Sequence, residues 1–314
     1  MGIDGGGTSL RVVVVETNMQ VLHQVQGETA NPSIIGEAES AARIQQGVTM
    51  ALHQAGVTQA DVRAVGIGIA GASAVYAEDW LRATVRVILP GVFVAPSSDN
   101  EIALVGAHAA RRGVLLLSGT GSVAFGINEA GESRQIGGWG YLMGDEGSGY
   151  WIGMEALRAI VRAQDQRSPD TALTTLVLEH LGLSHPVELI RWLYRGKDSP
   201  ADAASRGVPR NREVAALSGL VMAAAESGDK VANRIIDTAA IELADHCRAV
   251  IRVLAIQDAH VGFAGGLLTN NTLLRQRVID TFGSDVKIIT PRYPPVVGAA
   301  LLAKTLSNIQ GHNS

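Results

Sequence analysis

Two short turns, each built from glycine and threonine, could hold phosphate groups. The first runs from Asp4 to Thr8 and the second from Ser118 to Ser122. Glycine has no Cβ atom, so backbone N–H groups can approach a ligand closely and together form an anion-binding concavity. Asp4 adds a carboxylate, a ligand type that suits hydrated Mg²⁺ beside a polyphosphate. These residues indicate a nucleotide phosphate site, although a plain glycine-rich hairpin turn would have the same composition.

Neither of the two best-known glycine loops fits the first turn. A P-loop requires a Lys-Ser or Lys-Thr pair at the start of a helix, and no lysine follows the glycines. A dinucleotide fingerprint would place its third glycine at Leu10 and then a helix. The chain continues instead through the β-branched residues 12–15, which favour a strand. The first turn is therefore expected to join two strands of a hairpin.

The elements expected around the two turns follow an α/β pattern. In the first half, strands are predicted at residues 12–15, 21–26, 64–70 and 92–95, and helices at 37–55, 79–88 and 100–111. In the second half, strands are predicted at 114–117, 123–127 and 259–264, and helices at 150–163, 171–181, 186–194, 213–226, 230–255, 271–281 and 295–306. Strand, glycine turn and strand open each half, which favours two duplicated halves over chance recurrence of the turn.

Length and composition are those of a globular protein with two domains. The chain has 314 residues, of which 46% are hydrophobic, so each domain can bury a core. A formal net charge of −4 without a basic run argues against nucleic acid or an anionic membrane as a partner. No apolar stretch approaches the roughly 20 residues of a membrane span. Because a strand is expected directly after Met1, we expect no signal peptide and a cytoplasmic location.

The single cysteine, Cys247, excludes an internal disulfide and a multi-thiolate metal site within one chain. Its neighbours Leu243, Val250 and Leu254 recur at helical spacing. This spacing predicts a buried position on a helix.

Five motifs occur in one order along nearly the whole chain: DGGGT from Asp4, SSDNEIAL from Ser97, LLLSGTGS from Leu115, GGWGYLMGDEGSGYW from Gly137 and FAGG from Phe263. In this the chain resembles the N-acetylglucosamine kinase family, within the superfamily of sugar and acetate kinases, actin and heat-shock chaperone ATPases. The pair GGWG and GDEGS is the most specific match. The resemblance implies a two-domain actin-like (ribonuclease H-like) ATPase fold with duplicated βββαβαβα halves and extra helices in the second half. It implies an N-terminal domain of residues 1–111, with helix 294–314 packing back on it, and a C-terminal domain of residues 112–293.

The resemblance also implies a reaction, transfer of the γ-phosphate of ATP to a hydroxyl, O6, of N-acetylglucosamine. Asp99 matches the catalytic base of the family, whereas on sequence alone it would serve as a helix cap. Mg²⁺ would be held by Asp4 through water. The nucleotide-binding residues that the resemblance implies are Asp4, Gly5, Gly6, Gly7, Thr8, Gly119, Thr120, Gly121, Gly265 and Gly266.

For the sugar, the resemblance implies contacts from Asn31, Ser122, Gly138, Trp139, Gly140 and Asp145. Trp139 would offer an apolar face to the ring or to an acetyl methyl group, or else would be a core tryptophan. We rank Asp145 as a ligand and Glu146 as the cap of the next helix. Val123 and the run Asn31-Pro32-Ser33 depart from the pattern of animal members. Glucosamine or another 2-amino sugar therefore stays open as the substrate.

Two functions of other kinds are also open. The same family includes ATPases that activate CoA-ester dehydratases around a shared iron–sulfur cluster, but Cys247 has no companion cysteine. The second alternative is a sugar-sensing regulator that binds a sugar without catalysing a reaction. The intact Asp99 and both glycine turns argue against this alternative. A homodimer is expected only because dimers are the commonest oligomers.

Overall fold

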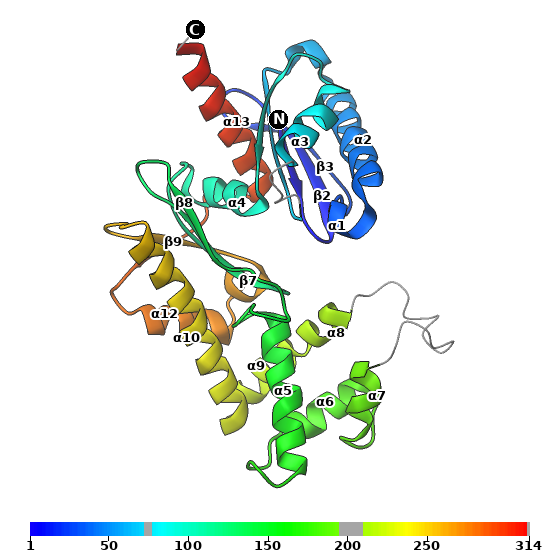
Figure 1. Ribbon diagram of the computed structural model, residues 1–314, viewed down its shortest axis with the longest axis vertical. Coiled ribbons are helices and arrows are strands. Elements are labelled where there is room, and N and C mark those ends of the chain that lie inside the picture. Colours follow the sequence, from blue (N-terminus) through cyan, green and yellow to red (C-terminus); the bar gives the residue numbers. More distant parts are fainter. Residues whose placement is uncertain (72–76, 195–209, 313–314) are drawn as a thin grey trace. The chain divides into compact units, whose positions relative to one another are not determined.

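The computed structural model describes residues 1–71, 77–194 and 210–312, which form two five-stranded sheets (Figure 1). The first sheet has the order β3-β2-β1-β4-β5 and the second the order β8-β7-β6-β9-β10, so the same topology occurs twice. This repeat confirms the predicted α/β fold with duplicated βββαβαβα halves. The strands are β1 (Gly2–Gly5), β2 (Ser9–Val15), β3 (Val21–Glu28), β4 (Ala64–Ile69), β5 (Phe93–Ser97), β6 (Gly113–Ser118), β7 (Ser122–Ile127), β8 (Ser133–Gly137), β9 (His260–Ala264) and β10 (Lys287–Ile289).

The chain divides by its internal packing into two units. Unit 1 contains Met1–Leu115, Phe125–Ser133 and Ile289–Ser314, and unit 2 contains Leu116–Ala124 and Arg134–Ile288. The domain boundary between residues 111 and 112 stays a prediction. The last helix, α13 (Pro295–His312), belongs to unit 1, where it contacts β1, β4 and helix α4 (Asp99–His108).

The first glycine turn joins β1 to β2, as expected. The two strands are antiparallel, and Gly5 lies opposite Leu10, so Gly6, Gly7 and Thr8 form the connection. This register confirms the predicted hairpin. Strand β1 also pairs in parallel with β4, and β4 with β5, so the carboxyl ends of these three strands lie at one edge of the sheet.

Helices cover both faces of the first sheet (Figure 1). On one face, Ile3 and Val12 belong to the same buried cluster as Ile44 and Val48 of helix α2 (Glu37–Ala55) and residues of α3 (Ala77–Arg86). Successive side chains of a strand alternate between faces, and Val13 accordingly packs on the opposite side, against α13. The α/β core of unit 1 is thus built on both sides of β1 and β2.

Three glycines allow helices to approach the second face closely. A Cβ atom at Gly2 would overlap the carbonyl oxygen of Val296, and one at Gly66 would overlap that of Ala299. Where α13 crosses α4, a Cβ atom at Gly298 would overlap the carbonyl oxygen of Ile102. These positions require glycine for packing, because a side chain at Gly2 or Gly66 would push α13 off the sheet and one at Gly298 would push it off α4.

Unit 2 is mainly helical outside its strands. Its helices are α5 (Gly149–Gln164), α6 (Leu173–Leu181), α7 (Glu188–Tyr194), α8 (Arg210–Ala216), α9 (Ser218–Glu226), α10 (Lys230–Val253), α11 (Gly266–Thr269) and α12 (Leu273–Phe282). The short helices α1 (Pro32–Ile35) and η1 (Gln59–Asp61) lie in unit 1. Within the parts of the chain that the structure describes, no helix has both the length and the apolar character needed to cross a membrane.

In unit 2, the structure interrupts one predicted helix and buries the single cysteine as predicted. The single helix predicted at 213–226 is wrong, since it is interrupted at Leu217, whose N–H donates to the carbonyl of Val214 at 3.1 Å in a tight turn. The hydroxyl of Ser218 donates to the carbonyl of Ala215 at 2.7 Å and competes with regular helix bonding there. Cys247 is fully buried on α10, as its spacing predicted.

Candidate active site

The first glycine turn is anchored at its base and open at its tip. The N–H of Gly6 donates to the carbonyl of Ser9 at 2.9 Å, and the hydroxyl of Thr29 donates to the carbonyl of Gly6 at 2.9 Å. A Cβ atom at Gly5 would meet Cδ1 of Ile69, so a larger residue there would displace the end of that side chain. Thr8 at the tip is exposed. The turn is therefore held in place while its tip can meet a ligand.

Asp4 is a buried carboxylate at the end of β1. It is 8% exposed, and Nη1 of Arg11 lies 3.5 Å from its Oδ2. Burial raises the pKa of Asp4 from 3.8 to about 6, with Arg11 opposing this shift and the charge of Asp99 adding to it. A carboxylate in this environment favours any additional cation close to it. The strand registers place Asp4 opposite Gly68 and Gly68 opposite Ser97, so Asp99, two residues after Ser97, lies at the same sheet edge.

Asp99 is the first residue of α4, and the cap of that helix is Ser98. The hydroxyl of Ser98 accepts the N–H of Glu101 at 3.1 Å, so the interpretation of Asp99 as the cap is wrong. Oδ1 of Asp99 accepts the N–H of Asn100 at 3.0 Å. Burial raises the pKa of Asp99, and backbone hydrogen bonds oppose this. Unit 1 thus places the first turn, Asp4 and Asp99 at the edge where β1, β4 and β5 end.

Asn31 is connected to the same region through Thr29. Its N–H donates to Oγ1 of Thr29 at 3.1 Å, and Thr29 in turn donates to Gly6 of the first turn. Oδ1 of Asn31 accepts the N–H of Ser33 at 2.9 Å and caps α1. This local role explains the residue type at the start of a helix, and sugar binding by Asn31 stays a prediction.

The second glycine turn is fixed by the start of α5. The N–H of Gly119 donates to the carbonyl of Gly121 at 2.9 Å, and the N–H groups of Gly149 and Tyr150 donate to the carbonyls of Gly119 at 2.8 Å and Thr120 at 3.3 Å. Thr120 is exposed, as Thr8 is in the first turn. In both turns, backbone hydrogen bonds therefore hold the glycine residues in place while the threonine at the tip is exposed.

Asp145 lies beside the second turn in a strained conformation. Its φ angle is +62°, which is unfavourable for a residue with a side chain, and the residue is 8% exposed. Its carboxylate accepts backbone hydrogen bonds from Ser122 and Gly140, while burial raises its pKa. It thereby ties the second turn to the glycine-rich segment at 137–144. Strain of this kind is found where a side chain is held for function.

The segment next to Asp145 exposes large apolar side chains. Trp139 is 73% exposed, so the interpretation as a core tryptophan is wrong. Gly138 and Gly140 on either side have φ angles of +71° and +84°, which glycine adopts freely. Trp139 can therefore offer an apolar face to a ligand.

Ser122 and Glu146 are joined through the backbone. The hydroxyl of Ser122, which is 2% exposed, donates to the carbonyl of Glu146 at 2.8 Å. The expected role of Glu146 as a cap is wrong, because the hydroxyl of Ser148 accepts the N–H of Trp151 at 3.1 Å and caps α5. The Glu146 carboxylate instead lies 3.7 Å from Nε2 of His246.

Gly265 packs directly on the second turn. Its φ angle is +79°, and a Cβ atom there would overlap the carbonyl oxygen of Ser118. Gly266 is exposed and has room for a side chain. Unit 2 therefore brings Gly265, the second turn and Asp145 together.

Sequence reasoning missed polar residues that hold these segments, namely Arg11, Thr29, Glu101 and Arg111. A signal for one of them was present, since residues 98–101 read Ser-x-x-Glu, the pattern of a capping box. The other three have no short motif, because their partners lie 7 to 23 residues away in the sequence.

The residues present in unit 1 fit a magnesium-bound polyphosphate. Asp4 supplies a hard oxygen ligand whose raised pKa reflects the unfavourable burial of its charge, and the adjacent turn supplies glycine backbone and the Thr8 hydroxyl. Mg²⁺ retains several waters and needs few protein ligands, so one carboxylate is sufficient.

Comparisons with known proteins give relatives that cover nearly the whole chain. The N-acetylmuramic acid/N-acetylglucosamine kinase of Clostridium acetobutylicum is 32% identical over 310 residues, covering 97% of this chain and 98% of the relative. The N-acetyl-D-glucosamine kinase of Dictyostelium discoideum is 30% identical and covers 96% of this chain and 97% of its own. The glucosamine kinase GspK of Vibrio cholerae is 25% identical over 96% of this chain and 95% of its own.

A solved structure agrees with these relatives. It is a Chromobacterium violaceum protein described as a candidate N-acetylglucosamine kinase, 28% identical, with a TM-score of 0.70 over 96% of this chain and 97% of its own. A glucokinase of the ROK family from Streptomyces griseus, 18% identical over 97% of this chain and 98% of its own, has a TM-score of 0.55 and shares the fold. The model of the BadF/BadG/BcrA/BcrD ATPase family matches residues 1–303. The chain belongs to the BadF/BadG/BcrA/BcrD ATPase family.

Proposed function

We propose that this protein is an ATP-dependent kinase that phosphorylates N-acetylglucosamine on a hydroxyl group, O6. The observation that carries the proposal is a pair of carboxylates, the buried Asp4 and the half-buried Asp99, at the sheet edge that also carries the first glycine turn. One acid beside a phosphate turn suits a metal, and a second acid close to it suits an acceptor hydroxyl. The whole-length similarity to curated amino-sugar kinases supports the same reaction.

The nucleotide would be held by residues of both glycine turns and by the turn before α11. Backbone groups of Gly5, Gly6, Gly7, Gly119 and Gly121, with the hydroxyls of Thr8 and Thr120, would bind phosphate oxygens, and Gly265 and Gly266 would lie against the adenosine. Asp4 would hold Mg²⁺ through water. Magnesium-bound ATP supplies the phosphoryl group and neutralises the charge on it.

Asp99 acts as the general base in this proposal. One carboxylate oxygen, Oδ1, is oriented by the N–H of Asn100, and we assign the proton of the attacking hydroxyl to Oδ2. Burial raises the pKa of Asp99, which makes its carboxylate a stronger proton acceptor. The hydrogen bond from the sugar hydroxyl to Asp99 would also orient that hydroxyl for attack, which raises the rate in addition to the proton transfer.

The sugar would contact Asn31, Ser122, Gly138, Trp139, Gly140 and Asp145. Val123 packs against Gly138: it is 7% exposed, and its Cγ2 lies 3.2 Å from the place that a Cβ atom at Gly138 would take. The similarity to two relatives named for N-acetylglucosamine favours this sugar as the substrate. The similarity to a glucosamine kinase makes glucosamine or another 2-amino sugar the second candidate.

The remaining alternatives differ in what they would require. An activator of a CoA-ester dehydratase needs an accessible thiolate for its cluster, but Cys247 is fully buried, and burial raises the pKa of its thiol. A sugar-sensing regulator would bind an amino sugar without turnover. The proposal places the protein in the cytoplasm and leaves a homodimer as a prediction.

The test is a coupled assay of ADP formation with ATP, Mg²⁺ and one of four sugars: glucose, glucosamine, N-acetylglucosamine or N-acetylmannosamine. We expect turnover that depends on the sugar and is highest with N-acetylglucosamine. Asp99→Asn should lower kcat by a factor on the order of 10² to 10⁴. Asp79→Asn, an exposed acid in the first turn of α3, is the matched control and should keep full activity.

ADP formation that is the same with and without every sugar would overturn the kinase assignment. A preference for glucosamine would replace the substrate and keep the reaction. Near-normal kcat in Asp99→Asn would remove Asp99 from the mechanism.

A further inference from the structure

We propose that Glu101 is a positioning residue that fixes the orientation of Asp99, and that Arg111 holds Glu101 in place. This inference rests on the proposed function, because it assigns Glu101 a role in the same phosphoryl transfer. All three residues belong to unit 1.

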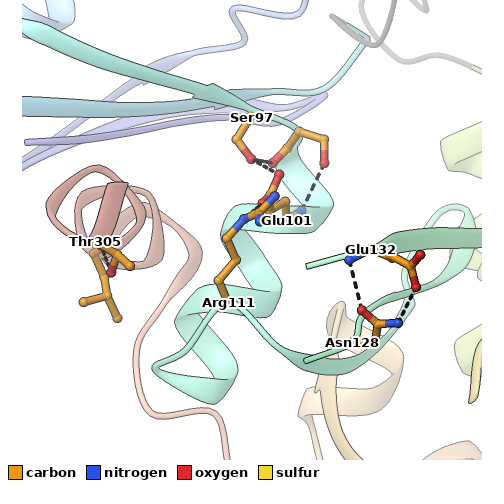
Figure 2. A network of polar contacts seen from close by, with 8 residues as sticks. Ser97, Glu101, Arg111, Asn128, Glu132 and Thr305 are labelled. Carbon is orange, nitrogen blue, oxygen red and sulfur yellow. Dashed lines mark hydrogen bonds and ion pairs between the residues drawn. The ribbon is translucent and has the colours of Figure 1, made fainter. Parts of the chain in front are cut away.

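The two carboxylate oxygens of Glu101 have different partners (Figure 2). Oε2 accepts the hydroxyl of Ser97 at 2.9 Å, and Oε1 accepts Nε of Arg111 at 2.6 Å. The Glu101 side chain is 16% exposed and that of Arg111 is 37% exposed. A short, charge-assisted bond in a partly buried position fixes geometry better than an exposed ion pair does.

The arrangement differs from an ordinary capping box. In that motif the glutamate at the third helical position returns to the N–H of the cap residue. Here the cap residue, Ser98, accepts the N–H of Glu101 as usual, but the Glu101 carboxylate binds the preceding residue, Ser97. The hydroxyls of both Ser97 and Ser98 are therefore hydrogen-bonded to Glu101. These bonds connect the two sides of the turn that carries Asp99.

Arg111 adds an anchor from beyond the other end of α4. The helix ends at His108, and Arg111 lies in the connection to β6. Its ion pair with Glu101 spans α4 from the first turn to this connection (Figure 2). A simple helix cap would need no such partner. The arginine also compensates the charge of Glu101, which stands two residues from the proposed base.

A displaced catalytic group lowers the rate strongly, since a shift of about 1 Å can cost on the order of 10²-fold in kcat. Loss of the Glu101 contacts leaves Asp99 in the sequence but frees its turn. We therefore expect an effect on kcat and little effect on the binding of ATP or sugar, which other segments contact.

The experiment measures kcat and KM of the full chain in four variants. Glu101→Gln retains the size of the side chain but removes its charge, and Arg111→Gln removes the anchor. Glu78→Gln is the matched control, because Glu78 also lies in a first helical turn and pairs with an arginine, Arg82, at 3.3 Å, but on α3. The fourth variant combines Glu101→Gln with Asp99→Asn.

We expect Glu101→Gln to lower kcat by roughly 10- to 100-fold with KM for ATP and sugar within about twofold of wild type. Arg111→Gln should show a smaller loss of the same kind, and Glu78→Gln none. In the Asp99→Asn background, Glu101→Gln should cause no further loss, because a positioning residue acts through the group it positions. A purely structural role would lower activity by the same factor in both backgrounds.

Normal kcat in Glu101→Gln, a rise in KM with kcat unchanged, or an equal loss in the Asp99→Asn background would each overturn the inference. If Glu101→Gln does not fold, Arg111→Gln alone and combined with Asp99→Asn provides the same comparison. A wild-type protein without sugar-dependent ADP formation would instead refute the proposed function, and this inference with it. An active wild type with an unaffected Glu101→Gln variant refutes only the positioning role.

Discussion

Replacing Asp4 by asparagine should make the ligand-free protein more stable while it removes activity. In the folded protein, burial raises the pKa of Asp4 from 3.8 to about 6. Each pKa unit corresponds to about 1.4 kcal/mol, so the ionised carboxylate costs on the order of 3 kcal/mol of folding free energy above pH 7. Asparagine has the same shape and no charge, and it removes most of that cost.

The sign of the pH dependence follows from the direction of the shift. A carboxyl group whose pKa is raised on folding contributes most to stability below its unfolded pKa of 3.8, and this contribution is lost as pH rises through about 6. The advantage of Asp4→Asn should therefore be largest near pH 8, fall to roughly half near pH 5 and vanish below pH 4. Arg11 loses a partner at 3.5 Å, but it is 42% exposed, so this costs about 0 to 1 kcal/mol.

The assay is urea denaturation followed by circular dichroism, with EDTA and without nucleotide, at several pH values between 4 and 8. Asp61→Asn is the matched control, because hydrogen bonds from Thr58 lower the pKa of Asp61 and its charge is favourable in the folded state. That variant should be less stable than wild type at pH 8, not more. Equal stability of Asp4→Asn and wild type at pH 8, or a difference that does not change with pH, would refute the account of Asp4 as a desolvated carboxylate.

Two further predictions concern unit 2. Gly265→Ala should lower the thermal midpoint of unfolding by several degrees, because its Cβ atom would overlap the carbonyl oxygen of Ser118 and its φ angle is +79°. Gly266→Ala, at the adjacent open position, should leave the midpoint unchanged. Equal midpoints for the two variants would contradict the packing of Gly265 on the second turn. Cys247 should react with a thiol reagent only at the rate of unfolding, since it is fully buried and burial raises the pKa of its thiol. Immediate labelling of the native protein would contradict the buried position of Cys247 on α10.

The sequence predicted the fold well where local signals agree with tertiary packing. The β-branched residues 12–15 follow the first turn, and α2 ends at Ala55, directly before Gly56 with its φ angle of +68°, as glycine after a helix predicts. Strand β8 was missed because three of its five residues are exposed and show no alternation, and β10 because it has only three residues. Short or solvated strands exist through their neighbours rather than through their own pattern.

The candidate site could be predicted only in part, for a related reason. Asp4, Asp99 and Asp145 stand in motifs, and the structure buries Asp4 and Asp145 and leaves Asp99 half-buried. The left-handed conformation of Asp145 could not be assigned from the sequence, because aspartate adopts it only occasionally and its carboxylate is held by backbone groups of Ser122 and Gly140. Glu101 and Arg111 are ten positions apart, and a pair at that separation across a helix end has no periodic signature.

The contact between α13 and the first sheet has a consequence for synthesis on the ribosome. Val13 is buried against Val296, Val297 and Ala300, which emerge nearly three hundred residues later. Helix α4 covers part of this face of the amino-terminal sheet, since a Cβ atom at Gly68 would meet Ile102, but Val13 stays uncovered until translation is almost complete. Nascent chains halted before residue 295 should therefore be bound by chaperones through the uncovered part of that face, and release should coincide with arrival of the final helix.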